Sequence, residues 1–218
     1  IMCSLYECSN SVLTSSGLSA IAISLTSFLS NGDEILITEN CYEPVLNLAN
    51  LHLKKFGIKH FFFSNDLGEF KKQINQKTKI IYLESPGSLN YEVQDLIEIV
   101  KIAKKKKIMT IIDNTWATFL GCNPLKFGID IVIESATKYL SGHSDNFLGI
   151  IVTNSKVFGK IIKQNAVRVG DYVSSESCFN ATKGIKTLSI RLEKHKINAQ
   201  KVFNYLESHS YIEDIFFL

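Results

Sequence analysis

Short apolar runs recur along the chain and predict buried strands. They are rich in β-branched residues and contain few polar positions. Runs of this kind are typical of strands that are covered on both faces, as in a parallel or mixed sheet between helices. The predicted strands are EILIT (34–38), KHFFF (59–63), KIIYLE (79–84), KIMTIID (107–113), IDIVIES (129–135) and LGIIVT (148–153).

Amphipathic segments separate these runs and predict helices, because their apolar residues recur at a spacing of three to four. Gly57 ends one of them as a C-cap signal. The lysine run 104–107 ends another, where cations complement the helix dipole. The predicted helices cover 18–30, 43–57, 65–76, 93–107 and, as one long helix, 177–207. The alternation of strands and helices predicts the α/β class.

The length and the two ends of the chain suggest how it is divided. We expect residues 1–176 to form a large domain, and residues 177–218 to form a long bridging helix and the start of a smaller domain. The chain begins with Ile1 instead of methionine and ends without a polar tail. We therefore expect a piece of a longer protein, with the large domain incomplete at its start and the small domain truncated.

Composition narrows the class of partner. The net charge is +3 and the lysines are scattered, so no nucleic-acid partner is expected. No apolar run reaches the length of a membrane span and no signal peptide is visible. The cysteine count of five is odd and no CxxC occurs, which argues against a disulfide framework or a zinc site. These features predict a cytoplasmic protein whose cysteines are small apolar fillers.

Unusual polar stretches follow four of the predicted strands. They are NCYEP (40–44), ESPGS (84–88), DNTWA (113–117) and SATKYLSGHSD (135–145). In open α/β sheets, ligands bind at the carboxyl ends of the strands. We therefore expect these four stretches to form one site.

Lys138 is the residue with the most informative neighbours. Lysine forms Schiff bases with aldehydes, and the hydroxyls of Ser135 and Thr137 can reach a phosphate. Asp113 ends a strand, where a buried carboxylate needs a cationic partner such as a protonated pyridine nitrogen. Tyr42 can stack on an aromatic ring. Together with a phosphate cradle, these groups are the parts that a pyridoxal phosphate (PLP) enzyme requires.

The phosphate cradle is predicted where Gly17 and Leu18 begin a helix, because helix N-termini with glycine bind phosphate. Taken alone, this loop is a weak signal, and a simple N-cap by Ser16 explains it better.

The other candidates also have plain structural interpretations. Tyr42 and Trp116 are typical core aromatics, Asp113 can cap the turn that follows it, and His143 can be a buried histidine with its hydrogen bonds satisfied. Lys138 is one lysine among many. No histidine spacing indicates a metal, so no metal site is expected.

Longer motifs carry a resemblance to a known family. The chain is similar to the Cys/Met-metabolism family of PLP-dependent enzymes, of the aspartate-aminotransferase fold type, and most of all to its bacterial cystathionine β-lyases. ESPGS favours the β-lyases, because γ-synthases and γ-lyases usually carry Asn-Pro after ESP. The motifs are SGLSA, GDEILITENCYEP, TKIIYLESPGS, EVQDL, IIDNTWAT, FGIDIVIESATKYLSGHSD and KGIKTLSIRLEKH.

The resemblance implies a role for each site residue. Lys138 would carry the cofactor and move protons, Asp113 would pair with the pyridinium nitrogen, and Tyr42 would stack on the cofactor ring and assist proton transfer. The phosphate would be bound by the side chains of Ser135 and Thr137 and by the backbone amides of Gly17 and Leu18. Arg191 matches a family position and receives no role.

The resemblance also implies an activity. It is the α,β-elimination of L-cystathionine to L-homocysteine, pyruvate and ammonia, a step of methionine biosynthesis. The alternatives are γ-synthase or γ-lyase chemistry of the same family, or an inactive truncated chain that keeps the fold. The fold implied is a PLP-dependent transferase-like large domain, in a homotetramer when intact. The family's Tyr-x-Arg arm and its carboxylate-binding arginine are expected outside this chain.

Overall fold

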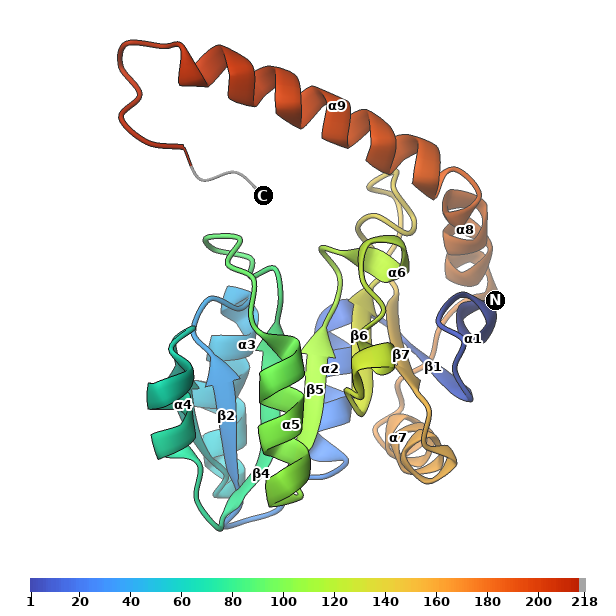
Figure 1. Ribbon diagram of the computed structural model, residues 1–218. Coiled ribbons are helices and arrows are strands. Elements are labelled where there is room, and N and C mark those ends of the chain that lie inside the picture. Colours follow the sequence, from blue (N-terminus) through green and yellow to red (C-terminus); the bar gives the residue numbers. More distant parts are fainter. Residues whose placement is uncertain (216–218) are drawn as a thin grey trace.

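The computed structural model describes residues 1–215 and shows a single mixed sheet between two layers of helices (Figure 1). The strand order is β1-β7-β6-β5-β4-β2-β3. Neighbouring strands from β3 to β6 are parallel, whereas β7 is antiparallel to both β6 and β1. The strands are β1 (Asn10–Thr14), β2 (Glu34–Thr38), β3 (Lys59–Phe63), β4 (Thr78–Glu84), β5 (Met109–Asp113), β6 (Ile131–Ser135) and β7 (Gly149–Thr153). The predicted α/β class with a mixed, mostly parallel sheet is confirmed.

All six predicted strands exist, and each ends at the expected residue. The strand that the sequence analysis missed is β1, at the edge of the sheet. Only Val12 and Thr14 of this strand are buried. The strand lies at the edge of the sheet, so its other residues are partly exposed to solvent. A strand of five residues with so few apolar positions does not stand out from a loop.

Two hydrophobic clusters, one on each face of the sheet, form the core. Helices α1, α4 and α5 cover one face, whereas α2, α3 and α7 cover the other. Successive strand residues alternate between the two, so Leu83 packs in the first cluster and Tyr82 in the second. Each fully buried leucine or isoleucine contributes about 1.5–3 kcal/mol to this core.

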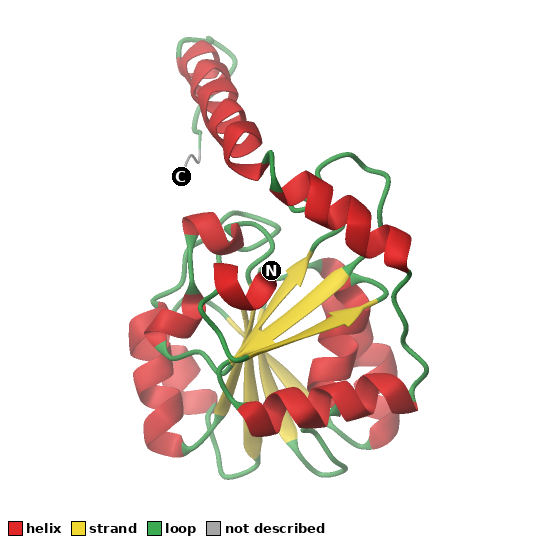
Figure 2. Cartoon of the chain, turned by 90° about the vertical axis from the view of Figure 1, so that its right-hand side faces the viewer, coloured by secondary structure: helices red, strands yellow, loops and turns green. Residues whose placement is uncertain are grey.

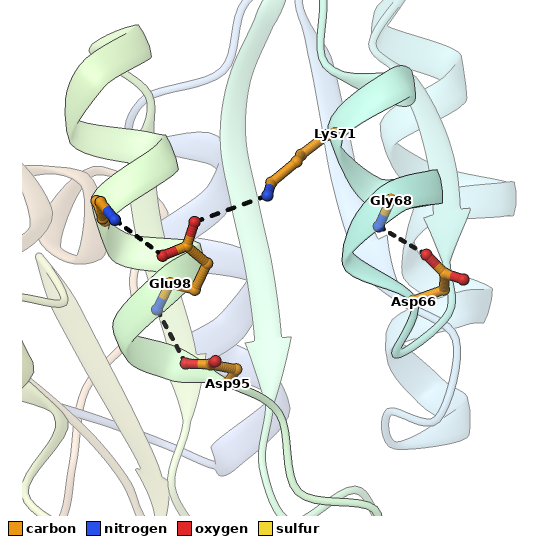
Figure 3. A network of polar contacts seen from close by, with 6 residues as sticks. Asp66, Gly68, Lys71, Asp95 and Glu98 are labelled. Carbon is orange, nitrogen blue, oxygen red and sulfur yellow. Dashed lines mark hydrogen bonds and ion pairs between the residues drawn. The ribbon is translucent and has the colours of Figure 1, made fainter.

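Side-chain caps begin most of the longer helices. The capping residues are Ser16, Asp66, Asp95, Ser155 and Ser174. Figure 3 shows the Asp66 and Asp95 caps and an ion pair of 3.7 Å between Lys71 and Glu98, which links α4 to α5. The helices are α1 (Met2–Leu5), α2 (Gly17–Thr26), α3 (Glu43–Asn47), α4 (Leu67–Gln73), α5 (Leu96–Lys106), α6 (Thr118–Gly121), α7 (Lys156–Arg168), α8 (Ser175–Ile185) and α9 (Leu188–Glu207).

Three expected helix features can be compared directly. The lysine run 104–107 does close α5, as predicted. The segment predicted as one helix over 43–57 is instead built from α3, the π-helix η1 (Leu48–His52) and the 3-10 helix η2 (Leu53–Phe56). It ends at Gly57, which is left-handed with φ 71°, so the predicted C-cap is confirmed.

The prediction of a single helix over 177–207 is wrong, because the chain breaks between α8 and α9. Thr187 has φ −108° and ψ 2°, and its hydroxyl donates to the Gly184 carbonyl at 3.1 Å. The Arg191 guanidinium donates to the same carbonyl at 2.9 Å. These bonds satisfy the end of α8 and turn the chain away from it.

Helix α9 projects away from the sheet (Figures 1 and 2), and of its residues only Leu188 is buried. Ala181 of helix α8 packs in the first of the two core clusters, and Gly184 of the same helix is also buried. The division into 1–176 and 177–218 stays a prediction, and its last residues, 216–218, lie outside the described part. No helix within residues 1–215 combines the length and apolarity needed to cross a membrane.

Candidate active site

A cavity of about 590 Å³ lies at the carboxyl ends of the central strands. All four unusual stretches of the sequence contribute to its wall, and α9 adds two residues. The residues that line it are Tyr42, Glu84, Ser88, Asp113, Thr115, Trp116, Thr137, Lys138, Tyr139, Gly142, Ser144, Asn146, Phe147, Arg191 and His195. The four stretches therefore line one cavity, and its use as a site stays a prediction.

Lys138 and Tyr42 face each other in this cavity. The Nζ atom of Lys138 lies 4.8 Å from the centroid of the Tyr42 ring. A tight turn fixes the lysine backbone, because its N–H donates to the Ser135 carbonyl at 3.1 Å and its own carbonyl accepts from Gly142 at 2.7 Å. An amine is thus presented above an aromatic face, in a space that is open to a ligand.

The core-aromatic interpretation is wrong for both aromatic candidates. Tyr42 and Trp116 are 37% and 42% exposed, and both line the cavity. His143 is also exposed instead of buried, and its ring bonds the Ser141 carbonyl at 2.7 Å, so the buried-histidine interpretation is wrong as well.

Two carboxyl groups lie side by side at the floor of the cavity. Glu84 ends β4 and Asp113 ends β5, and the two residues are partners in the strand register. Burial raises the pKa of Asp113, whereas hydrogen bonds from Thr115 and the charge of Lys138 lower it. Asp113 Oδ1 accepts the Thr115 N–H at 2.9 Å, so the turn-capping interpretation also holds. The buried acid still has room for a cationic ligand on the cavity side.

Glu84 was not singled out by the sequence analysis, and it positions Tyr42. Its Oε2 atom accepts the Tyr42 N–H at 2.8 Å, and its Oε1 atom accepts the Ser88 hydroxyl. Burial and then the charge of Asp113 raise the pKa of Glu84 to about 7. The sequence signal was an acid at the end of an otherwise apolar strand.

The predicted phosphate-binding residues form a second, tightly packed part of the site. A Cβ atom at Gly17 would lie 2.6 Å from Cβ and 2.7 Å from Oγ of Ser135, so only glycine allows this approach. Ser16 caps α2 by accepting the Ser19 N–H at 3.1 Å, which confirms the N-cap interpretation. The helix N-terminus and a serine hydroxyl therefore meet at one point.

The structure separates the predicted residues into two sets. Tyr42, Asp113, Thr137 and Lys138 line the cavity, whereas Gly17, Leu18 and Ser135 are not among its lining residues. Hydrogen bonds connect the sets, because the Ser135 N–H donates to the Thr115 hydroxyl at 2.7 Å, beside Asp113. The Leu18 side chain is exposed, so only its backbone can contribute to a cradle.

Asp171, more than 150 residues further along the chain, holds the Gly17 loop, and no local pattern marks it. Its Oδ1 atom accepts the Ser15 N–H at 2.8 Å, and its Oδ2 atom accepts the Ser19 hydroxyl. The two contacts lie on either side of Gly17. They fix the loop without using the amides of Gly17 and Leu18.

A third buried acid, Glu134, lies behind the site, next to Ser135. The Tyr6 hydroxyl donates to its Oε1 atom, and the Asn114 side chain donates to the Tyr6 oxygen at 2.9 Å. Burial raises the pKa of Glu134 to about 8 and also raises the pKa of Tyr6. Burial therefore favours the neutral form of the Glu134 carboxyl. Among residues 1–215, no three His, Cys, Asp or Glu side chains gather as a metal-ligand set.

Replacing Glu134 by glutamine is expected to stabilise the cofactor-free chain at alkaline pH. Because burial raises the pKa of Glu134 from 4.5 to about 8, its ionisation lowers the wild-type free energy of unfolding as the pH rises between these values. Glutamine does not ionise and still accepts the Tyr6 hydroxyl. Urea unfolding should show a stability gain that is near zero at pH 4.5 and reaches about 1–4 kcal/mol by pH 8.

Glu176→Gln is the matched control, because Glu176 is exposed on α8. Its effect on the unfolding free energy should not change with pH over the same range. A Glu134→Gln difference that is equally flat would contradict the buried, neutral state of Glu134.

The mixed sheet, with a lysine, a carboxylate and an aromatic ring at its carboxyl edge, is typical of the large domain of PLP-dependent enzymes. The family model described as Cys/Met metabolism PLP-dependent enzyme matches residues 1–218. The chain therefore belongs to this family, and the expected cofactor, PLP, is confirmed at that level.

Individual relatives differ in their activities. Cystathionine β-lyase MetC of Escherichia coli K12 is 36% identical over 95% of this chain and 53% of that protein. An L-alanine/L-glutamate racemase of Wolbachia pipientis wMel is 34% identical over 93% and 50%. The crystal structure of a cystathionine γ-lyase from Lactobacillus plantarum, complexed with L-serine, matches with a TM-score of 0.94 and 33% identity, over 98% of this chain and 56% of that one. The chain spans about half the length of the curated relatives it matches.

Proposed function

We propose that the protein to which this chain belongs is a PLP-dependent carbon–sulfur lyase that converts L-cystathionine to L-homocysteine, pyruvate and ammonia by α,β-elimination, in methionine biosynthesis. The observation that carries the proposal is the placement of the Lys138 amine 4.8 Å above the Tyr42 ring, in a cavity that also contains the buried Asp113. The same elimination is the activity named for several relatives at 33–36% identity.

The residues present fit PLP in charge and in shape. Asp113 is a buried carboxyl on the cavity floor, suited to a protonated ring nitrogen. The contact between Gly17 and Ser135 at the start of α2 supplies amides and a hydroxyl to a phosphate. Lys138 would hold the aldehyde carbon, Tyr42 would pack on the ring, and Ser135, Thr137, Gly17 and Leu18 would bind the phosphate.

The chemistry divides between the cofactor and the chain. When bound, PLP supplies the electron sink that stabilises negative charge at the Cα atom of an amino acid. Lys138, once free, is placed to take the Cα proton and to pass it to the sulfur that leaves Cβ. Glu84 keeps Tyr42 in place through the backbone N–H, so that the phenol lies beside the amine for proton transfer. The thiolate of homocysteine then leaves from Cβ.

The products of the reaction test the proposal against its alternatives. The complete protein is incubated with PLP and L-cystathionine, and the keto acids are separated. Pyruvate supports β-elimination, whereas 2-oxobutyrate supports γ-elimination, which the similarity to the L. plantarum enzyme favours. Loss of optical rotation from L-alanine without a keto acid supports racemisation, which the Wolbachia relative favours. Either of the last two results overturns the proposed reaction.

The assembly and the location are also proposals. We expect a homotetramer, to be measured on the complete protein by light scattering. The described cysteines are all free, which supports the cytoplasm as the compartment.

Replacing Gly17 by alanine is expected to raise the dissociation constant of PLP at least about tenfold. The new Cβ atom would lie 2.6 Å from Cβ of Ser135, so the start of α2 or the serine must move. Visible absorbance during a PLP titration measures the effect. Gly121→Ala is the matched control, because a Cβ there meets Ala117 at an ordinary 3.6 Å. Equal affinities of the two variants would contradict the cradle.

A further inference from the structure

Two cysteines lie at the two ends of the turn that closes α1. The Cys8 N–H donates to the Cys3 carbonyl at 2.9 Å, and the Glu7 N–H donates to the Ser4 carbonyl at 3.4 Å. Glu7 between them is left-handed, with φ 53°. This pair of bonds, with a left-handed residue after the cap, is a Schellman motif.

The Schellman motif brings together the side chains of its first and last residues, which here are Cys3 and Cys8. The backbone bond between the two residues limits their Cα–Cα separation to less than about 7 Å, within reach of a disulfide. Burial, and then the charge of the nearby Cys3 thiol and a hydrogen bond with it, raise the pKa of the Cys8 thiol to about 11, in keeping with this geometry. The Cys8 thiol also donates to the Asn10 carbonyl at 3.4 Å.

A backbone hydrogen bond across one turn joins these two cysteines and holds their thiols near each other. Both are free and partly exposed, so a small oxidant can reach them. Cys41 is buried, and Cys122 and Cys178 are also free. Two thiols held at such a separation are the arrangement in which oxidation of one sulfur is resolved by the other.

We propose that Cys3 and Cys8 form a reversible disulfide when the protein meets a low-molecular-weight disulfide such as oxidised glutathione. The Cys3 thiolate attacks one glutathione sulfur and releases the first glutathione. The Cys8 thiol then gives up its proton, attacks the Cys3 sulfur and releases the second glutathione. Two protein thiols are oxidised, one glutathione disulfide is reduced to two thiols, and the two protons pass to the released thiolates.

The disulfide would close a short loop around Tyr6. This side chain is 1% exposed, and its hydroxyl donates to Glu134, the residue before Ser135. Oxidation would therefore fix the turn from which the Tyr6 hydroxyl donates to Glu134 of β6. The Cys3–Cys8 link is independent of the reaction proposed for the cavity, and its test needs neither PLP nor turnover.

Mass spectrometry of the whole chain tests the proposal. The reduced chain is incubated with oxidised glutathione, its remaining thiols are blocked with N-ethylmaleimide, and intact mass and peptides are measured. The expected product has lost two hydrogen atoms, contains a peptide cross-linked through Cys3 and Cys8, and reverts with dithiothreitol. Blocking by maleimide at both cysteines, a stable glutathione adduct on either, or a cross-link to another cysteine would each overturn the proposal.

Single variants test the resolving step. Cys3→Ser and Cys8→Ser each leave one thiol of the pair, which should retain bound glutathione at least about tenfold more than the wild-type pair does. Cys122→Ser is the matched control and should form the Cys3–Cys8 link as the wild-type chain does. If neither single variant accumulates the adduct, the two thiols do not act as a pair.

Discussion

Replacing Lys138 by alanine is expected to abolish the covalent attachment of PLP and to lower turnover at least about a thousandfold. Lys138 provides the amine that lies above the Tyr42 ring, at 4.8 Å from its centroid, and alanine removes both the attachment point and the proposed base. The expected spectrum contains free PLP without the absorbance band of the lysine-bound cofactor. Borohydride reduction followed by peptide mapping should label Lys138 in the wild-type protein and no residue in the variant.

Lys105→Ala is the matched control, because Lys105 is an exposed lysine in the last turn of α5 and is not among the residues that line the cavity. It should keep the band, the label and the turnover. Circular dichroism should show the same fold for both variants, because the Lys138 side chain is exposed in the cavity. A lysine-bound band that persists in Lys138→Ala would mean that another lysine holds the cofactor.

The apolar patterns were sufficient to predict the central strands because each is buried on both faces. β2 and β7, for example, are buried at every position, so no polar residue interrupts the run. The same argument explains why β1 was missed, since its alternating burial at the sheet edge leaves only a short, weak pattern. The local pattern also failed to predict the helix break at Thr187. This break between α8 and α9 depends on the hydrogen bonds to the Gly184 carbonyl.

The site divides in a similar way. Tyr42, Asp113 and Lys138 were accessible from the sequence because each follows or ends a predicted strand, and the edge rule brings such residues together. Asp171 was not accessible, because its contacts with Ser15 and Ser19 cross more than 150 residues of the chain. Nothing in a local pattern marks a residue that acts through such distant partners.

The two buried acids of the cavity lower the stability of the cofactor-free fold. Glu84 and Asp113 are neighbours in the strand register, and each is removed from water. Burial and then the negative charge of Asp113 raise the pKa of Glu84 to about 7, so the two acids resist ionising together. Buried acids that lower stability at the carboxyl end of a sheet are typical of a site that binds a positively charged group.

Replacing Asp113 by asparagine is accordingly expected to stabilise the cofactor-free chain while lowering turnover about 10²–10⁴-fold. Because burial raises the pKa of Asp113 above 3.8, its ionisation lowers the free energy of unfolding as the pH rises through that range. Asparagine still accepts the Thr115 N–H but carries no charge. At pH 8, in urea and without PLP, the variant should therefore have a higher free energy of unfolding than the wild-type chain.

Measuring both stability and turnover distinguishes a role of Asp113 in cofactor binding from a role in folding. Glu134→Gln also removes a buried acid and should also stabilise the chain, but Glu134 lies behind the cavity and its loss should leave turnover of the complete protein within about threefold of wild type. Asp113→Asn should also lower the pKa of Glu84 from about 7, because the neighbouring charge is gone. If Asp113→Asn destabilises the chain, the carboxylate is a structural group. If it stabilises the chain and turnover persists, Asp113 is not the partner of the cofactor ring, and the charge that balances it must come from Glu84.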